Sequence, residues 1–188
     1  MCGKLLLCFL IGSIPFAVVS MWGTGVDITT FGSGNPGFNN VLRYSKWRSA
    51  LCLIGDAGKG LFPIWLFSRP DDPVTVPWLF GFAAIAGHCY SPFLGWNGGK
   101  GLATAAGVML YLFPRIVLPC VLWYIIWRII GSKAGWKERG AIASLSAALV
   151  FVVLLLVFSG WQQAALGAAL LAFIAFRHKK NFANMAAA

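Results

Sequence analysis

The chain has 188 residues, of which 59% are hydrophobic and only 11% are charged, whereas soluble domains carry roughly 25% charged residues. With a mean hydropathy of +0.78, this composition excludes an ordinary soluble domain and indicates a single integral membrane domain over residues 1–188. The formal net charge of +10 is found in nucleic-acid-binding proteins, but basic cytoplasmic loops also produce it, so we expect no nucleic-acid partner.

Apolar segments follow one another along the chain, and most approach the length needed to cross a bilayer. They predict about seven transmembrane helices, at residues 4–22, 49–68, 74–93, 101–113, 114–131, 139–158 and 161–177. The fourth segment is short, and only Phe113, Pro114 and Arg115 divide it from the fifth. The predicted fold class is therefore an all-α polytopic membrane protein.

Positive charges flank these segments unevenly, and Lys and Arg collect in cytoplasmic loops. The charges fit best with the N-terminus outside and the C-terminus in the cytoplasm. The cytoplasmic loops then hold Arg43, Lys46, Arg48, Lys100, Arg128, Lys133, Lys137, Arg139, Arg177, Lys179 and Lys180. The outer side holds Lys4, Arg69 and Arg115. We assign Arg48 and Lys133 to topology alone. This orientation brings three polar stretches, residues 31–43, 95–101 and 177–181, to the cytoplasmic face.

The first polar stretch, FGSGNPGFNNVLR at 31–43, is rich in glycine and in hydrogen-bond donors. Its glycines permit turns in which consecutive backbone N–H groups point at one anion, and Arg43 offers a bidentate contact to phosphate. The alternative is a flexible loop between two spans. The candidate phosphate-binding residues are Gly32, Ser33, Gly34, Asn35, Gly37, Asn39, Asn40 and Arg43.

The second polar stretch, WNGGKGLATAAG at 96–107, places two glycines and a lysine before a helix-forming run. Free N–H groups and the helix dipole favour an anion at such a helix start. We therefore take Gly98, Gly99 and Lys100 as candidates for phosphate binding. A membrane-surface turn with a topology-setting lysine is the simpler alternative.

Charged and titratable residues elsewhere are few. Asp56 and Lys59, in GDAGKG at 55–60, lie three residues apart inside a span and share a helix face. Because charge in hydrocarbon is costly, we expect an ion pair that supports the loops. His88 is expected to pack or to anchor a loop. His178, among basic residues at 177–181, is suited to bind phosphate or exchange protons, or belongs to a basic stop after the last span.

No metal site is expected. The five cysteines are scattered in apolar surroundings without the spacing of metal ligands or of a disulfide framework. We therefore expect no cofactor.

Five motifs together resemble those of the bacterial acyl-phosphate:glycerol-3-phosphate acyltransferase family. They are GSIPFA at 12–17, DITTFGSGNPGFNNVLR at 27–43, GDAGKG at 55–60, GHCYSPFLGWNGGKGLAT at 87–104 and RHKKN at 177–181. Each motif is short, but the ordered set covers most of the chain. The resemblance implies a seven-helix, N-out enzyme of the bacterial inner membrane, with its active site at the cytoplasmic face.

The resemblance also implies the reaction and its participants. An acyl group passes from acyl phosphate to glycerol 3-phosphate, giving lysophosphatidic acid and phosphate for phospholipid synthesis. The implied partners are these two substrates, the lipid bilayer and an enzyme that produces acyl phosphate. The implied catalytic residues are Ser33, Arg43, Lys100, His178 and Asn181, with Ser144 as a further ligand.

Two questions stay open at the level of sequence. The hydroxyl proton passes either to the phosphate of the acyl donor or to His178. A membrane carrier for a small phosphorylated anion, without acyl transfer, is the alternative function.

Overall fold

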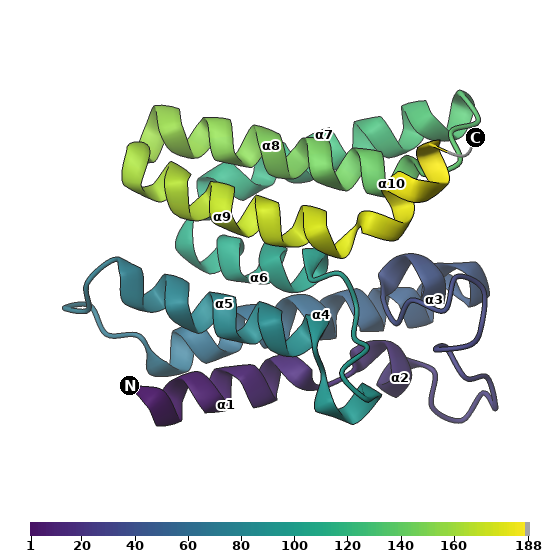
Figure 1. Cartoon of the computed structure of the whole chain (residues 1–188), viewed down its shortest axis with the longest axis horizontal. Coiled ribbons are helices and arrows are strands. Elements are labelled where there is room, and N and C mark those ends of the chain that lie inside the picture. The colour runs from purple at the N-terminus through teal and green to yellow at the C-terminus, as the bar shows by residue number, and fades with distance from the viewer. Residues whose placement is uncertain (187–188) are drawn as a thin grey trace. The chain divides into compact units, whose positions relative to one another are not determined.

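The computed structural model describes residues 1–186, and all regular secondary structure in that range is helical (Figure 1). The chain forms an N-terminal unit, Met1–Leu112, and a C-terminal unit from Phe113 onward. The first unit contains α1 (Cys2–Ser13), α2 (Phe16–Ser20), α3 (Phe38–Tyr44), α4 (Lys46–Phe67), α5 (Thr75–Cys89), the 3-10 helix η1 (Pro92–Leu94) and α6 (Leu102–Leu112). The second contains α7 (Pro114–Lys133), α8 (Arg139–Ser159), α9 (Trp161–Arg177) and α10 (Lys179–Ala186).

Each predicted membrane segment coincides with helix in the structure, with α1 and α2 together forming the first. Within residues 1–186, four helical segments are long and apolar enough to cross a membrane: Cys2–Ser20, Lys46–Phe67, Pro114–Lys133 and Arg139–Ser159. The remaining apolar helices are shorter, with 15 residues in α5, 11 in α6 and 17 in α9. The all-helical, membrane-type fold is as predicted.

Glycines let α4 and α6 pack backbone against backbone in the N-terminal unit. A methyl group on Gly60 of α4 would overlap the carbonyl oxygen of Thr104 on α6. One on Gly107 of α6 would overlap the carbonyl oxygen of Ala57 on α4. Small residues give helices in a bilayer this close approach, where dispersion contacts replace the hydrophobic drive.

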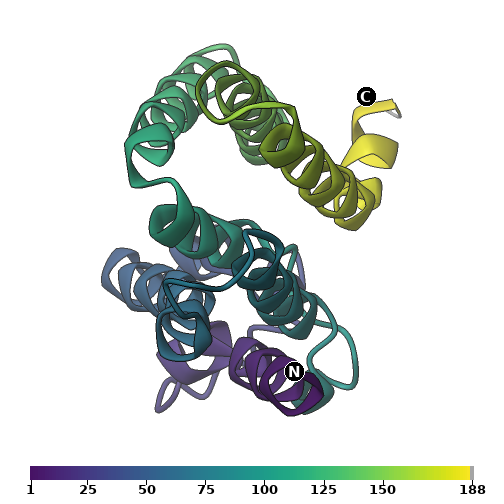
Figure 2. The same ribbon diagram turned by 90° about the vertical axis from the view of Figure 1, so that its left-hand side faces the viewer.

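The helices α1 and α5 use the same device, and they lie side by side (Figures 1 and 2). A methyl group on Gly12 of α1 would overlap the carbonyl oxygen of Ala84, and one on Gly87 of α5 would overlap that of Phe9. Two glycine-lined contacts therefore hold α1 to α5 and α4 to α6.

The first apolar segment is broken between α1 and α2. Pro15 has no N–H and interrupts the helical hydrogen-bond ladder. The carbonyl oxygens at the break find partners elsewhere in the unit. Ser91 Oγ donates to Ser13 O at 2.6 Å, and Lys59 Nζ donates to Ile14 O at 2.6 Å. These bonds matter because a buried carbonyl without a partner is costly.

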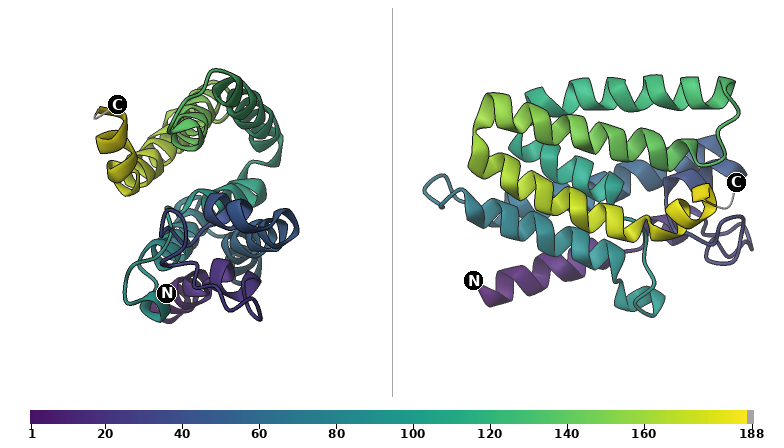
Figure 3. Two further views of the ribbon diagram at one scale, coloured as in Figure 1. Left: turned by 90° about the vertical axis from the view of Figure 1, so that its right-hand side faces the viewer. Right: turned by 45° about the horizontal axis from the view of Figure 1, so that its top comes forward.

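In the C-terminal unit, consecutive helices pack side by side, α7 on α8 and α8 on α9. Gly160, at φ +87°, makes the turn from α8 to α9. Trp127 of α7 stacks on Trp136 of the next turn, with ring centroids 5.6 Å apart. After His178 the chain changes direction, and α10 bends away from the axis of α9 (Figure 3).

Candidate active site

The first polar stretch is folded around one buried side chain. Asn40, at the start of α3, donates from Nδ2 to Phe31 O at 2.8 Å and to Ile28 O at 3.1 Å. Its Oδ1 accepts the backbone N–H of Ser33 at 3.0 Å. Asn40 is 1% exposed. Its amide therefore uses both ends to fix the turn of the glycine loop.

Arg43 lies over this turn with an exposed side chain. Gly32 has φ +59°, and a Cβ placed on it would be 2.5 Å from Asn40 Oδ1 and 3.4 Å from Arg43 Nη1. Only glycine suits such a left-handed position between two side chains. Gly34, at φ +66°, makes the next turn. The loop thus presents Arg43 beside the exposed Ser33.

The other predicted ligands of this stretch differ in exposure. Asn39 is exposed, Asn35 is half-buried and Gly37 is buried. Asn35 N lies 3.5 Å from Ser33 Oγ, and Gly37 precedes α3 with an extended backbone.

Upstream of the glycines, Asp27 closes the loop with a small turn of its own. Its Oδ1 accepts the Thr29 hydroxyl at 2.7 Å and the Thr29 backbone N–H at 2.9 Å. These bonds, the hydroxyl first, lower the pKa of the Asp27 carboxyl because they favour its charged form. The turn is therefore complete above the ordinary pKa of an aspartate and is lost as pH falls through the lowered one.

The second polar stretch lies directly on the end of α5. Gly98 N donates to Cys89 O and Gly99 N to His88 O, each at 3.1 Å. Lys100 follows with a half-buried side chain, and Gly101, at φ +86°, leads into α6. The paired glycines and Lys100 therefore lie directly before the start of α6, as the sequence predicts.

The two glycine-bearing stretches meet within the N-terminal unit. A Cβ on Gly99 would be 3.1 Å from Pro36 O. A narrow crevice is lined by Pro36, Gly99, Asp56, Lys59 and His88. The structure therefore brings the Ser33 and Arg43 loop against the Lys100 loop.

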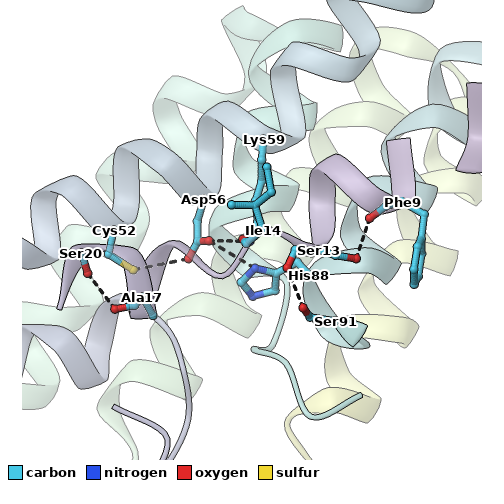
Figure 4. A network of polar contacts seen from close by, with 10 residues as sticks. All are labelled: Phe9, Ser13, Ile14, Ala17, Ser20, Cys52, Asp56, Lys59, His88 and Ser91. Carbon is cyan, nitrogen blue, oxygen red and sulfur yellow. Dashed lines mark hydrogen bonds and ion pairs between the residues drawn. The ribbon is translucent and has the colours of Figure 1, made fainter. Parts of the chain in front are cut away.

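The charged residues of GDAGKG are buried and form a polar network with His88 (Figure 4). Asp56 and Lys59 pair with 2.8 Å between Oδ1 and Nζ, and both side chains are 2% exposed. His88 Nδ1 lies 3.5 Å from the same carboxylate oxygen. Cys52 Sγ contacts the other oxygen at 3.6 Å. The predicted ion pair is present. His88, which was expected only to pack or to anchor a loop, lies beside it.

In the C-terminal unit, His178 occupies the junction of α9 and α10 and is buried. Its Nδ1 lies 2.8 Å from Ile174 O. A carbonyl only accepts, so Nδ1 carries the hydrogen, and in the neutral ring Nε2 is the basic nitrogen. Asn181 N donates to His178 O at 2.8 Å, which places these two predicted residues one turn apart.

Glu138 holds Asn181 from the loop before α8. Its Oε2 accepts from Asn181 Nδ2 at 2.6 Å and its Oε1 from Asn184 Nδ2 at 2.8 Å. Sequence reasoning missed Glu138, although a single acid among the basic residues of 133–139 is a visible signal. Ser144, on α8, is buried and donates to Ala141 O at 3.0 Å.

Arg48 has a role beyond the topology assigned to it. Its Nη1 donates to Ser20 O at 2.6 Å and to Trp22 O at 3.1 Å, at the end of α2. Beyond the topological charge assigned to it, the Arg48 side chain therefore satisfies carbonyls that the short helix leaves open.

Comparisons with known proteins agree on the family. The glycerol-3-phosphate acyltransferase family model matches residues 3–188. Curated proteins of that name from Neisseria meningitidis and Bordetella petrii are 38% and 41% identical to this chain, over 94% and 96% of it and 89% and 87% of their own lengths. Crystal structures of PlsY, an integral membrane glycerol 3-phosphate acyltransferase, in glycerol 3-phosphate and lysophosphatidic acid forms, match with TM-scores of 0.84 and 0.83 at 30% identity. They cover 99% of this chain and 92% and 91% of the matched chains. The chain belongs to the glycerol-3-phosphate acyltransferase family.

Proposed function

We propose that this protein transfers an acyl group from acyl phosphate to glycerol 3-phosphate, giving 1-acyl-glycerol 3-phosphate and phosphate. The observation that carries the proposal is the match, over 99% of the chain, to an enzyme structure solved in its glycerol 3-phosphate and lysophosphatidic acid forms. The meeting of two glycine-turned loops that bear Arg43 and Lys100 supports it from the chain itself.

The reaction requires mainly binding and orientation. A hydroxyl oxygen of glycerol 3-phosphate attacks the carbonyl carbon of the acyl phosphate, and the bond from that carbon to the phosphate oxygen breaks. The bonding electron pair leaves with the phosphate. An acyl phosphate is already activated, so holding two anions in reach of each other provides much of the catalysis.

The N-terminal unit supplies the phosphate contacts in this proposal. Arg43 and Lys100 bind phosphate oxygens and stabilise charge that develops as the bond breaks. Ser33 donates its hydroxyl, and Gly32 lets backbone and ligand approach each other. We assign Gly34, Gly98 and Gly99 to shaping the loops, because their N–H groups donate to Phe31 O, Cys89 O and His88 O. We assign Asn40 to shaping the loop, because its amide is already engaged at both ends.

The C-terminal unit contributes His178 and Asn181 to the same reaction. The hydroxyl proton passes to the departing phosphate or to His178, and if His178 accepts it, Nε2 is the acceptor because Nδ1 bonds to Ile174 O. Asn181, held by Glu138, is proposed as a substrate donor. Ser144 is a further candidate ligand through the acceptor side of its hydroxyl.

The membrane arrangement is part of the proposal. We place seven spans in one domain of a bacterial inner membrane, with the N-terminus outside and the active site at the cytoplasmic face. The distribution of Lys and Arg supports this orientation. An enzyme that produces acyl phosphate must supply the donor. We propose that this enzyme contacts the protein at the same cytoplasmic face.

Purified protein in lipid vesicles tests the function. We expect lysophosphatidic acid and phosphate to form from acyl phosphate and glycerol 3-phosphate, without metal or nucleotide. Activity only with acyl-CoA, or loss of activity on chelation, would contradict the proposal. Uptake of glycerol 3-phosphate into the vesicles without chemistry would identify the carrier instead.

A further inference from the structure

His88 stands between the buried ion pair and the lysine loop. It is the penultimate residue of α5 and is buried. Its imidazole faces Asp56, with 3.5 Å between Nδ1 and Oδ1 (Figure 4). Lys59 holds that same oxygen at 2.8 Å and is itself tied to Ile14 O. One edge of the ring therefore lies against a polar network that joins α4, α5 and the break in the first span.

His88 also contacts the lysine loop, both through its main-chain carbonyl and through the other edge of its ring. The Gly99 backbone N–H donates to the carbonyl of His88 at 3.1 Å. A methyl group on Gly98 would overlap that carbonyl oxygen, and one on Gly99 would overlap imidazole Nε2. Both glycines therefore lie directly against His88, one on its main chain and one on its ring. Lys100 is the next residue.

We propose that His88 is a positioning residue that sets the height and direction of the Lys100 loop, and that the Asp56–Lys59 pair fixes the His88 ring for this task. The catalytic part of this inference rests on the proposed function, whereas the part about loop position does not. Because no other neutral side chain carries polar atoms on two opposite edges of a rigid ring, histidine suits a place between a carboxylate and a glycine backbone. The Asp56–Lys59 pair would then influence the position of Lys100, and with it phosphate binding, through His88.

Limited trypsin digestion of the detergent-solubilised protein tests the loop without any substrate. Trypsin cleaves after Lys100, and also after Lys133 and Lys137 in the C-terminal unit, which serve as internal references. For His88→Ala we expect the rate at Lys100, relative to the references, to rise about tenfold, because local opening exposes the loop. The control is Ser49→Ala, a buried residue whose hydroxyl bonds only to its own helix at Lys46 O. An unchanged ratio in folded His88→Ala would overturn the proposal.

A double-mutant cycle tests the catalytic part. We expect His88→Ala to lower kcat/KM for glycerol 3-phosphate about tenfold, and the double variant with Lys100→Arg to fall less than about threefold below Lys100→Arg alone. Coupling of this kind means that His88 acts through Lys100. Effects that multiply would show that His88 only packs the core. An inactive wild type would refute the proposed function and leave the digestion result to decide the loop.

A second pair of variants decides the matter if His88→Ala does not fold. Gly99→Ala brings a methyl group against the ring, and the shorter side chain of His88→Asn removes that overlap while keeping a polar group near Asp56. We expect the double variant to show at least about fivefold slower relative cleavage at Lys100 than Gly99→Ala alone. Equal or faster cleavage in the double variant would overturn the proposal.

Discussion

Two arginines five positions apart show how one side-chain type takes different roles. Arg43 is exposed and lies beside a left-handed glycine, so its guanidinium faces the loop that we assign to phosphate. Arg48 donates to two backbone carbonyls at the end of α2. Exchanging Arg48 for Lys therefore tests structure, and it is unsuitable as a neutral control for Arg43.

The first prediction concerns the shape of the two site cations. Arg43→Lys loses a bidentate fork, and Lys100→Arg places a planar group where a compact charge fits against glycines. We expect each exchange to lower kcat/KM at least about tenfold, or about 1.4 kcal/mol of transition-state stabilisation. Steady-state kinetics in vesicles measure this. The matched exchanges Arg69→Lys and Lys133→Arg, at exposed positions, should leave kcat/KM within about twofold. If all four exchanges behave alike in folded protein, the phosphate-site assignment is wrong.

The second prediction concerns the buried amide of Asn40. Asn40→Asp replaces donors to Ile28 O and Phe31 O with a carboxylate oxygen, which leaves both carbonyls facing an acceptor. Losing such a buried partner costs about 1–3 kcal/mol, so the midpoint of thermal unfolding should fall by several degrees, on the scale expected for small domains. Asn39→Asp, at an exposed position beside it, should leave the midpoint unchanged. Equal midpoints for the two variants would remove Asn40 from its loop-shaping role.

At the scale of elements, glycine pairs determine how closely the helices approach. The motif GDAGKG serves packing as well as charge, because Gly60 meets α6 at a backbone carbonyl and Gly55 lies against the ring of Phe16. Its charged residues, Asp56 and Lys59, line the crevice beside His88. The motif glycines in the two loops thus allow tight turns, whereas Gly55 and Gly60 in α4 allow close packing against neighbouring groups.

The third prediction separates these requirements on a single helix. Gly60→Ala would push a methyl group into Thr104 O and separate α4 from α6, whereas Gly58→Ala meets nothing within 4 Å. We expect Gly60→Ala to unfold at a lower temperature, with a loss of about 1–3 kcal/mol for overpacking. Gly58→Ala should be neutral or stabilising by up to about 1 kcal/mol, because alanine is the better helix former. Thermal unfolding in one detergent compares the two, and a reversed order would contradict the packing described for α4 and α6.

The sequence predicts local features of this molecule better than long-range ones. Apolar runs locate the helices, and three-residue spacing predicts the Asp56–Lys59 pair, because both follow from periodicity along one chain segment. The contact of Glu138 with Asn181 joins residues 43 positions apart, and no local pattern encodes it. Asn40 was expected as a ligand because an amide serves a phosphate or a backbone equally well, and only the path of the loop distinguishes them.

At the scale of the whole molecule, the residues assigned to chemistry are divided between two units. The N-terminal unit carries Ser33, Arg43 and Lys100, with a buried ionic network beneath them. The C-terminal unit carries His178 and Asn181 at the end of its last apolar helix. A shared reaction therefore requires that all these segments face the same compartment.

The fourth prediction tests that requirement by cysteine labelling. Of the five cysteines, only Cys2 is exposed, and the buried ones are Cys8, Cys52, Cys89 and Cys120. Alanine therefore replaces the four buried cysteines, and Cys2 reports the side on which the N-terminus lies. Single cysteines at Asn39, Asn97 and Ala183, with Cys2 also replaced, report the three polar stretches. We expect Cys2 to react with an impermeant maleimide from outside in intact cells, and the other three only after permeabilisation. If any of the three reacts from outside, the shared cytoplasmic face is wrong.

The broken first helix has a consequence for the order in which the protein is made. Its carbonyls at Ser13 and Ile14 receive their side-chain partners from Ser91 and Lys59, which the ribosome adds only later, since synthesis starts at the N-terminus. The first helix therefore enters the bilayer before its own break is satisfied. Its final form depends on α4, which carries Lys59, and on the loop after α5, which carries Ser91, so insertion and tertiary folding of this unit are coupled. A chain whose synthesis stops before residue 91 should therefore have a first span that proteases cleave near Pro15.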